Sequence, residues 1–259
     1  MKAKKSLGQN FLIDNNIIKK IVEEINVTND DLIIEIGPGK GALTKQLKTK
    51  KTNLICYEID QDLKNILTPL EDDKTKIIYQ DFLKADILND IKDYKYNNLY
   101  IVGNLPYYIT TPIIEHLLNA NIKFKKLTIM IQKEVAERFM AKPGTRDYGY
   151  FTVLLDYYFN INRVCNVSRN SFNPIPNVDS TILSLSPKEN INIDDKTKYF
   201  NFVKQCFAQK RKTLRNNLRN YNWTDIELIL NKYGFNDSVR AEELNQDVFI
   251  SMYKKLFNR

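Results

Sequence analysis

The fold of this chain is decided by the stretch Leu32-Ile33-Ile34-Glu35-Ile36-Gly37-Pro38-Gly39-Lys40-Gly41. A short apolar run that ends in glycines predicts a buried parallel strand followed by a tight turn. Glycines let the backbone pass close to a ligand without Cβ clashes. The spacing is G-x-G-x-G with a proline inside, whereas the dinucleotide fingerprint is G-x-G-x-x-G and faces a pyrophosphate. A glycine turn alone is shared with NAD-binding proteins, but this spacing favours a cofactor without phosphates.

Strands and helices alternate on both sides of this turn. Further strands are predicted at residues 53–57, 76–79, 98–102, 127–131 and 178–186, and helices at 14–26, from 42, at 60–70, 110–119 and 132–140. The alternation predicts an α/β, Rossmann-like doubly wound sheet, in which ligands bind at the carboxyl ends of the strands. After a polar linker at 187–195, helices are predicted at 196–221, 225–233 and 245–257. We therefore expect a sheet domain at 1–187 and a smaller, all-helical domain at 188–259.

Groups that suit a nucleoside follow the second and third strands. Glu58 ends the second strand, where a carboxylate can accept from both ribose hydroxyls. Asp81 ends the third and can accept from an adenine amino group, with Phe82 beside it for stacking. Carboxylates also suit a positively charged sulfonium. Taken singly, Glu58 could be a solvated acid and Asp81 a turn or helix cap; together with the glycine turn they favour S-adenosylmethionine.

The fourth strand ends at Asn104-Leu105-Pro106-Tyr107. The exocyclic amino nitrogen of a base is a poor nucleophile because its lone pair is delocalised into the ring. The Asn104 amide oxygen and a backbone carbonyl can accept its two N–H bonds, and Pro106 removes a competing N–H and fixes φ. Tyr107 can stack on a base taken out of its helix. The motif and the glycine turn together predict an S-adenosylmethionine-dependent N-methyltransferase acting on nucleic acid.

Composition narrows the remaining classes. No apolar run approaches the roughly 18 residues of a membrane span. Cys56, Cys165 and Cys206 form no C-x-x-C pair, which favours a reducing cytosol and argues against a disulfide framework or a zinc site. His116 is the single histidine, so we expect no metal centre. The net charge of +8 and the pI of about 9.1 point to a polyanionic partner.

Over almost its whole length the chain resembles the ribosomal RNA adenine N6-dimethyltransferases. The resemblance is carried by residues 5–12, 35–43, 104–107, 132–136, 172–180, 206–218 and 240–244. The last two blocks resemble the small-subunit KsgA enzymes specifically, and the related Erm enzymes usually have isoleucine in place of Leu105. Lys40 is a departure, because many relatives have an uncharged residue there, and we expect it to affect cofactor affinity little.

The resemblance implies roles for the matching positions. Asn10 and Leu12 line the cofactor pocket, and S-adenosylmethionine is bound by Gly37, Glu58, Asp81 and Asn104, with Gly39 and Phe82 at the same site. The Asn104 side chain and the Leu105 carbonyl hold the target N6. Tyr107 and Phe172 clasp the adenine on its two faces; the competing interpretation of Phe172 is a core aromatic.

Basic residues predict two contacts with RNA. Arg211, Arg215 and Arg219 are spaced i, i+4, i+8, so on the predicted helix 196–221 they would share one face, which Lys210 and Lys212 broaden. Such a strip matches a phosphate track, although a solvated basic face is the alternative. A second contact is predicted from Lys133, Arg138, Lys142 and Arg146.

The expected function is dimethylation of N6 of two adjacent adenines in the 3′-terminal hairpin of small-subunit (16S) rRNA. We expect a monomeric, cytoplasmic enzyme whose action is coupled to assembly of the 30S subunit. Three alternatives are an Erm-like enzyme on large-subunit rRNA, a non-catalytic assembly factor and an NAD-dependent oxidoreductase. The C-terminal blocks, the intact Asn104 motif and the glycine spacing argue against them in turn.

Overall fold

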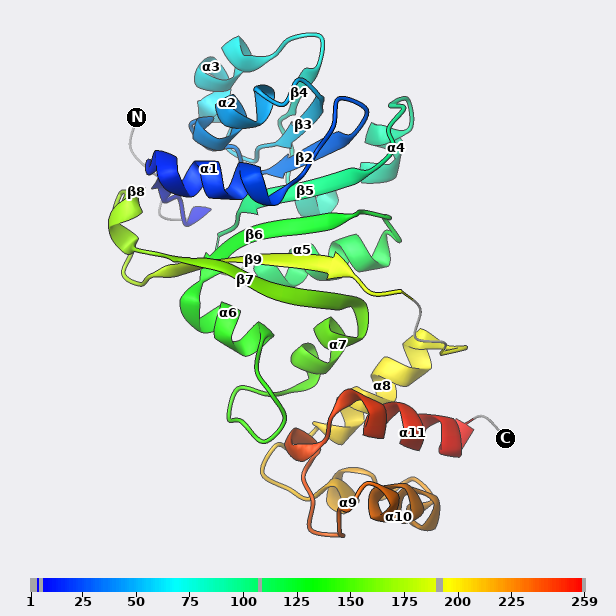
Figure 1. The fold of residues 1–259 in the computed structure, drawn as a ribbon. Coiled ribbons are helices and arrows are strands. Elements are labelled where there is room, and N and C mark those ends of the chain that lie inside the picture. Colours follow the sequence, from blue (N-terminus) through cyan, green and yellow to red (C-terminus); the bar gives the residue numbers. More distant parts are fainter. Residues whose placement is uncertain (1–3, 5–6, 107–108, 190–192, 258–259) are drawn as a thin grey trace. The chain divides into compact units, whose positions relative to one another are not determined.

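The computed structural model describes residues 4, 7–106, 109–189 and 193–257 (Figure 1). The chain forms two compact units: Met1–Ala136 with Ile161–Pro187, and Glu137–Asn160 with Lys188–Arg259. This division differs from the expected domains 1–187 and 188–259 because the segment 137–160 falls in the second unit. Its buried side chains Tyr148, Val153 and Tyr157 belong to the core of the helical unit, which explains the assignment.

The first unit is built on a seven-stranded sheet with the order β4-β3-β2-β5-β6-β9-β7. The strands are β2 (Leu32–Ile36), β3 (Asn53–Tyr57), β4 (Thr75–Ile78), β5 (Leu99–Asn104), β6 (Lys126–Gln132), β7 (Phe159–Val167) and β9 (Ser180–Pro187). In the part of the sheet with the order β4-β3-β2-β5-β6, neighbouring strands pair in parallel, and β9 runs antiparallel to β6. The chain runs outward from β2 to β4 and then returns to β5 beside β2. This reversal creates the switch point at which doubly wound sheets bind ligands.

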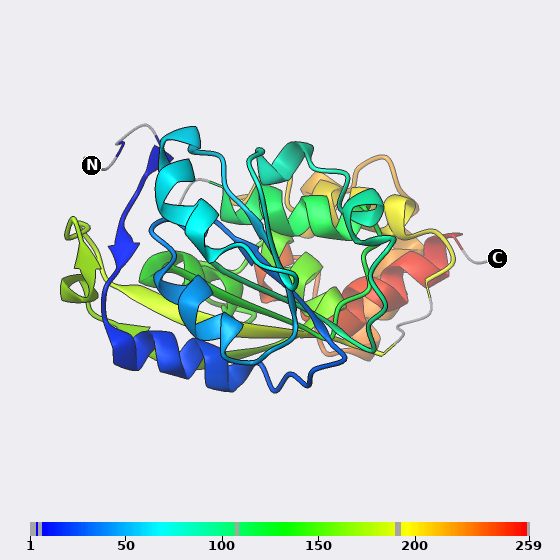
Figure 2. The same cartoon turned by 90° about the horizontal axis from the view of Figure 1, so that it is seen from above.

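Helices cover both faces of this sheet (Figures 1 and 2). One face carries α1 (Asn15–Glu24), α2 (Ala42–Lys48) and α3 (Lys64–Leu67), whose apolar side chains share a core with alternate residues of β2 and β3. The opposite face carries α4 (Ile87–Ile91) and α5 (Thr110–Asn119). The side chain of Asp14 caps α1 by accepting from the N–H of Asn16 at 2.9 Å.

The predicted helix 60–70 is not continuous. It consists of the 3-10 helix Gln61–Leu63, then α3, then the 3-10 helix Thr68–Leu70. Pro69 lies at the start of the last of these, where its missing N–H costs least. By contrast, the predicted strands at 32–36 and 53–57 and the predicted helix at 110–119 are found with those bounds.

The second unit is helical. It contains α7 (Tyr150–Tyr158), α8 (Lys196–Cys206), α9 (Leu214–Asn217), α10 (Trp223–Lys232) and α11 (Gln246–Phe257), while α6 (Lys133–Phe139) crosses from the first unit into it. Its core is rich in aromatic side chains, among them Tyr199, Phe202, Phe249 and Tyr253.

The predicted continuous helix 196–221 is wrong, because α8 ends at Cys206. The reason is the buried amide of Asn217, which donates to the carbonyls of Cys206 at 2.8 Å and Gln209 at 3.2 Å and accepts from the Gln209 N–H at 3.2 Å. Thr213 then caps α9 by accepting from the N–H of Asn216. The bonds of Asn217 satisfy backbone groups of Cys206 and Gln209, which a continuing helix would otherwise satisfy.

Candidate functional site

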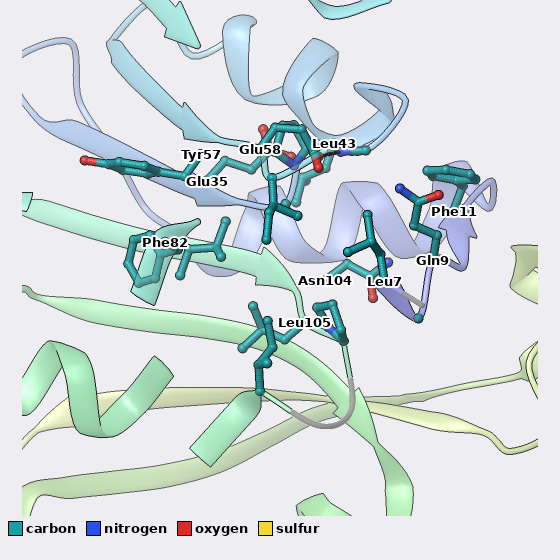
Figure 3. Close-up of a pocket in the computed structure, with 18 of the residues that line it drawn as sticks. Leu7, Gln9, Phe11, Glu35, Leu43, Tyr57, Glu58, Phe82, Asn104 and Leu105 are labelled. Atoms are coloured by element: carbon teal, nitrogen blue, oxygen red, sulfur yellow. Dashed lines mark hydrogen bonds between the residues drawn. The ribbon is translucent and has the colours of Figure 1, made fainter. Parts of the chain in front are cut away.

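A cavity of about 220 Å³ lies at the carboxyl ends of the parallel strands (Figure 3). It is lined by residues 7–12, 35–40, 42–43, 57–59, 80–83, 104–106 and 109, all in the first unit. The lining includes every predicted cofactor-binding residue: Asn10, Leu12, Gly37, Gly39, Glu58, Asp81, Phe82 and Asn104. Leu105 and Pro106 also line it, whereas Tyr107 lies outside the described residues. The sheet therefore gathers segments that are far apart in the sequence into one site.

The glycine turn approaches the cavity with its backbone. Gly37 and Gly39 have φ of +70° and +58°, a region that side chains rarely allow. A Cβ on Gly39 would lie 3.0 Å from the Phe11 ring, so the turn is packed closely against that ring. The Lys40 ammonium lies 4.6 Å from the centroid of the same ring. The turn is therefore packed against the N-terminal segment, while its glycines line the cavity.

Glu58 is held by two backbone donors at the edge of the cavity. Its carboxylate accepts from the N–H of Gly39 at 3.0 Å and from the N–H of Asp60 at 2.8 Å, and the residue is 4% exposed. Burial raises the pKa of this carboxyl, although the two N–H donors oppose the rise. Each carboxylate oxygen has a further lone pair, so Glu58 can also accept from hydroxyl groups of a ligand.

Glu35 is a second buried carboxyl in the cavity wall, and no role was predicted for it from the sequence. It is 1% exposed, and the Cys56 thiol lies 3.5 Å from one of its carboxylate oxygens. Burial raises the pKa of Glu35 to about 7, and the negative charge of Glu58 adds to the rise. The signal in the sequence was an acidic residue inside an otherwise apolar strand. Two such carboxyls suit a cationic ligand, which would favour their ionised forms.

Asn104 is oriented by the N-terminal segment. Its amide nitrogen donates to the carbonyl of Asn10 at 3.0 Å. Because a carbonyl only accepts, this contact fixes which end of the Asn104 amide faces Asn10 and leaves the amide oxygen as an acceptor. The Leu105 N–H donates to the carbonyl of Met130 on β6 at 3.1 Å, which anchors the motif to the neighbouring strand.

Asp81 and Phe82 also line the cavity, and Figure 3 shows Phe82 on the side away from Phe11. Asp81 accepts from the N–H of Leu83 at 3.0 Å and so caps a 3-10 helix, as one interpretation of the sequence predicted, while it still lines the cavity. Phe82 is 5% exposed and makes edge contacts with Tyr57 and His116, at centroid distances of 5.1 and 5.7 Å. The ring is therefore fixed in place before any ligand arrives.

The expected base-facing position of Phe172 does not agree with the structure. Phe172 is 2% exposed, belongs to the core of the first unit and does not line the cavity. It lies in β8 (Phe172–Asn173), which pairs antiparallel with β1 (Phe11–Leu12) so that Phe172 is opposite Leu12. This pairing directs the ring into the core, in agreement with the competing interpretation.

Three polar residues near the site, Lys4, Gln9 and Asp60, were assigned no role in this cavity from the sequence, which left Lys4 either in a solvated tail or in an arm that touches RNA. Asp60 is 2% exposed and accepts from the Lys4 ammonium and from the Gln9 amide, each at 2.6 Å. The only signal in the sequence was a second acid two residues after Glu58. Within the described residues, no group of three or more His, Cys, Asp or Glu could hold a metal ion.

The predicted RNA-binding side chains are all exposed: Lys133, Arg138, Lys142, Arg146, Lys210, Arg211, Lys212, Arg215 and Arg219. Arg211, Arg215 and Arg219 do not share a helix face, because they follow the break after Cys206. Within the second unit, the loop 141–149 and the turn 207–213 lie side by side instead. The Lys210 ammonium donates to the Arg146 carbonyl, and the Gly144 N–H donates to the Glu242 carbonyl at 2.7 Å.

Not every basic group on this surface is unpaired. Arg215 forms an ion pair with Asp237 at 2.6 Å and lies over the Trp223 ring. Lys210 lies 3.9 Å from Glu242. We call the loop and turn, with Lys142, Arg146, Lys210, Arg211 and Lys212, the basic surface of the second unit.

No helix in the described part of the chain has the length and apolar character needed to cross a bilayer.

A doubly wound sheet with a glycine turn, an acid at the next strand end and an Asn-Leu-Pro motif defines an S-adenosylmethionine-dependent methyltransferase. The model of the ribosomal RNA adenine dimethylase family matches residues 1–258, and the chain belongs to this family. Ribosomal RNA small subunit methyltransferase A of Geobacillus thermodenitrificans is 43% identical, over 98% of this chain and 90% of that protein. The protein of the same name from Mycoplasmopsis pulmonis is 42% identical, over 99% of this chain and 100% of its own.

Solved structures agree with this assignment. A dimethyladenosine transferase from Plasmodium falciparum superposes with a TM-score of 0.79 at 26% identity, over 96% of this chain and 97% of that one. The 23S rRNA methyltransferase ErmE superposes with a TM-score of 0.73 at 26% identity, over 95% and 99%. The predicted fold class, family and enzyme class, an rRNA adenine methyltransferase that uses S-adenosylmethionine, are confirmed.

Proposed function

We propose that this chain dimethylates N6 of two adjacent adenines in the 3′-terminal hairpin of small-subunit (16S) rRNA, during assembly of the 30S subunit. The observation that carries the proposal is the Asn104 amide, which is oriented by the Asn10 carbonyl at the edge of a cavity with buried carboxyls. Relatives that are 41–43% identical and are named small subunit methyltransferase A support the choice of the small subunit.

The cavity residues fit S-adenosylmethionine, which supplies an electrophilic methyl group when bound. Glu58 would accept from the ribose hydroxyls, Asp81 from the adenine amino group, and Gly37 and Gly39 would let the backbone approach. The positive charge of the cofactor's sulfonium suits the buried carboxyls of Glu35 and Glu58, whose pKa values burial raises. Phe82, already fixed by its ring contacts, would flank the adenine of the cofactor.

The target nitrogen would be held by the Asn104 side chain and the Leu105 carbonyl. A methylated aromatic amine loses its proton easily, so the site needs no strong general base. Orientation of the reacting atoms can supply roughly 7–11 kcal/mol at best. The catalytic contribution of Asn104 is therefore geometric, and its orienting bond to Asn10 is part of the mechanism.

RNA would be attracted by the basic surface of the second unit, together with Lys133, Arg138, Arg215 and Arg219. Phosphate contacts supply affinity and orientation rather than sequence information. The assembling 30S subunit is the proposed partner, and the enzyme would act as a monomer in the cytoplasm.

The decisive experiment incubates the protein and radiolabelled S-adenosylmethionine separately with undermethylated small and large ribosomal subunits, and maps the labelled adenines by nuclease digestion and mass spectrometry. Dimethyladenine in the small-subunit 3′ hairpin is the expected result. Label in large-subunit rRNA would replace the proposal by an Erm-like activity. Tight subunit binding without label would support a non-catalytic assembly factor.

A further inference from the structure

The N-terminal segment forms one wall of the cavity. Leu7, Gly8, Gln9, Asn10, Phe11 and Leu12 all line it, and Figure 3 shows Leu7, Gln9 and Phe11 on one side of the space. We call Lys4 together with residues 7–12 the N-terminal strap. The strap supplies backbone and side chains to both the cofactor region and the Asn104 motif.

The strap is attached at two points. At one point, the two oxygens of Asp60 accept from the Lys4 ammonium and the Gln9 amide, each at 2.6 Å. Gln9 also accepts from the Lys4 N–H at 2.8 Å, which closes the strap on itself. At the other point, the Asn10 carbonyl accepts from the Asn104 amide at 3.0 Å.

Asp60 also belongs to the cofactor side of the cavity, because its N–H donates to Glu58 at 2.8 Å. Its side chain is fully buried, whereas that of Asp62, which also pairs with Lys4, is 61% exposed. Burial alone would raise the pKa of Asp60, but the bonds from Lys4 and Gln9 hold it below its ordinary value. Asp60 is therefore a buried carboxylate whose charge depends on the strap.

One continuous path results: Glu58, Asp60, Gln9, Asn10 and Asn104. Asp60 also accepts from the N–H of Asp62 at 3.2 Å, which caps a 3-10 helix. A cap by itself would need neither full burial nor two further donors. The burial of Asp60 and its bonds to Lys4 and Gln9 therefore indicate a role in addition to capping.

We propose that Asp60 is a positioning residue: it holds the N-terminal strap against the cavity and, through Gln9 and Asn10, sets the orientation of Asn104. It touches neither the base nor the transferred group. Loss of its contacts should weaken cofactor binding and slow methyl transfer together. The inference rests on the proposed function only for the second of these effects.

The test is a double-mutant cycle that exchanges the two partners. Asp60→Asn places a donor against Lys4, and Gln9→Glu places a second carboxylate against Asp60. We expect each to raise the Kd for S-adenosylhomocysteine, measured calorimetrically, about tenfold and to lower kcat by a similar factor. The double variant Asp60→Asn/Gln9→Glu restores a complementary pair and should return both values to within about threefold.

Asp62→Asn is the matched control, because it removes an exposed carboxylate that contacts the same lysine, and it should change both values less than about twofold. If Asp60→Asn leaves Kd and kcat unchanged, whatever its effect on the unfolding temperature, Asp60 has only a structural role and the proposal is wrong. Additive single effects in the double variant would also overturn it.

A measurement on the unaltered protein avoids any failure of a variant to fold. Hydrogen exchange of the backbone amides of residues 7–12 should slow when S-adenosylhomocysteine is added, and unchanged exchange would contradict the role of the strap. Neither this nor the Kd series requires RNA. A protein that binds S-adenosylhomocysteine through the strap but labels no small-subunit adenine would refute the proposed function and leave this inference standing.

Discussion

The cavity of the first unit and the basic surface of the second unit are built in opposite ways. In the cavity, the functional groups are buried or half-buried, and some are fixed by partners that are distant in the sequence, as Gly39 fixes Glu58 and Asn10 fixes Asn104. On the basic surface the side chains are exposed, and pairs such as Lys210 with Glu242 contribute about 0–1 kcal/mol. The action of the cavity should therefore depend on how its groups are placed, whereas the attraction of RNA by the basic surface should depend on its charge. Substitutions in the two regions should change different quantities.

The largest effect is expected at Asn104. Asn104→Ala removes the proposed acceptor for the target nitrogen and should lower methyl transfer about 10²–10³-fold, the usual loss for one oriented polar group at a reacting centre. Binding of undermethylated small subunits should stay within about twofold, because phosphate contacts dominate affinity. Single-turnover methylation and filter binding measure the two quantities.

Asn104→Asp is the informative companion variant. It keeps an acceptor oxygen but can no longer donate to the Asn10 carbonyl, so we expect activity to fall below the native level despite the retained acceptor. Comparable losses of rate and subunit affinity in Asn104→Ala would refute the division between the two regions.

The second effect concerns stability and pH. The pKa of Glu35 rises from 4.5 to about 7 on folding, so the protonated carboxyl stabilises the fold fully below pH 4.5, and this contribution is lost as the pH rises through 7. The change corresponds to about 3 kcal/mol. Urea unfolding at pH 5 and pH 8 should show that Glu35→Gln lacks this loss.

Groups with lowered pKa, such as Asp31 and Asp60, act in the opposite sense and lose stability as the pH falls. They are the same in both proteins, so the difference between native protein and Glu35→Gln isolates Glu35. A parallel pH dependence of the two proteins would show that the carboxyl of Glu35 is not the source.

The third effect is on cofactor affinity. Glu58→Gln removes a charge but keeps the shape, and we expect the Kd for S-adenosylhomocysteine to rise about tenfold or more, since hydrogen bonds to charged groups contribute about 1.5–3 kcal/mol. Calorimetry checks the value. If Glu58→Gln weakens binding of the small ribosomal subunit but leaves the Kd for S-adenosylhomocysteine unchanged, Glu58 does not belong to the cofactor site.

The smallest effect is spread over the basic surface. Replacing Arg211 and Lys212 by Gln should reduce the slope of log K against log salt by roughly 0.7–0.9 for each phosphate that the variant no longer neutralises, without changing the rate at saturating RNA. Lys19→Gln/Lys20→Gln on α1 removes the same charge from an exposed site in the first unit and serves as the control. Equal slopes for both variants would exclude a specific phosphate track on the second unit.

The sequence by itself determined the doubly wound arrangement of the parallel strands and, to within about two residues, where each of them ends, but it did not predict β7 (Phe159–Val167). Apolar runs such as 32–36 fix the strands locally, and glycine is required where φ is positive, so the lining residues Gly37, Gly39, Glu58 and Asp81 could be predicted from local patterns. The family resemblance agreed with these local patterns and added Asn10 and Leu12, which no local pattern marks.

Only the tertiary structure decided the remaining points, because they depend on partners that are distant in the sequence. Phe172 is buried because β8 pairs with β1, and the helix predicted at 196–221 breaks because the Asn217 amide bonds to Cys206 and Gln209. The contact between Gln9 and Asp60 joins residues 51 positions apart. Propensity and periodicity report on neighbours within a turn or two, whereas these bonds form only after the sheet has brought the segments together.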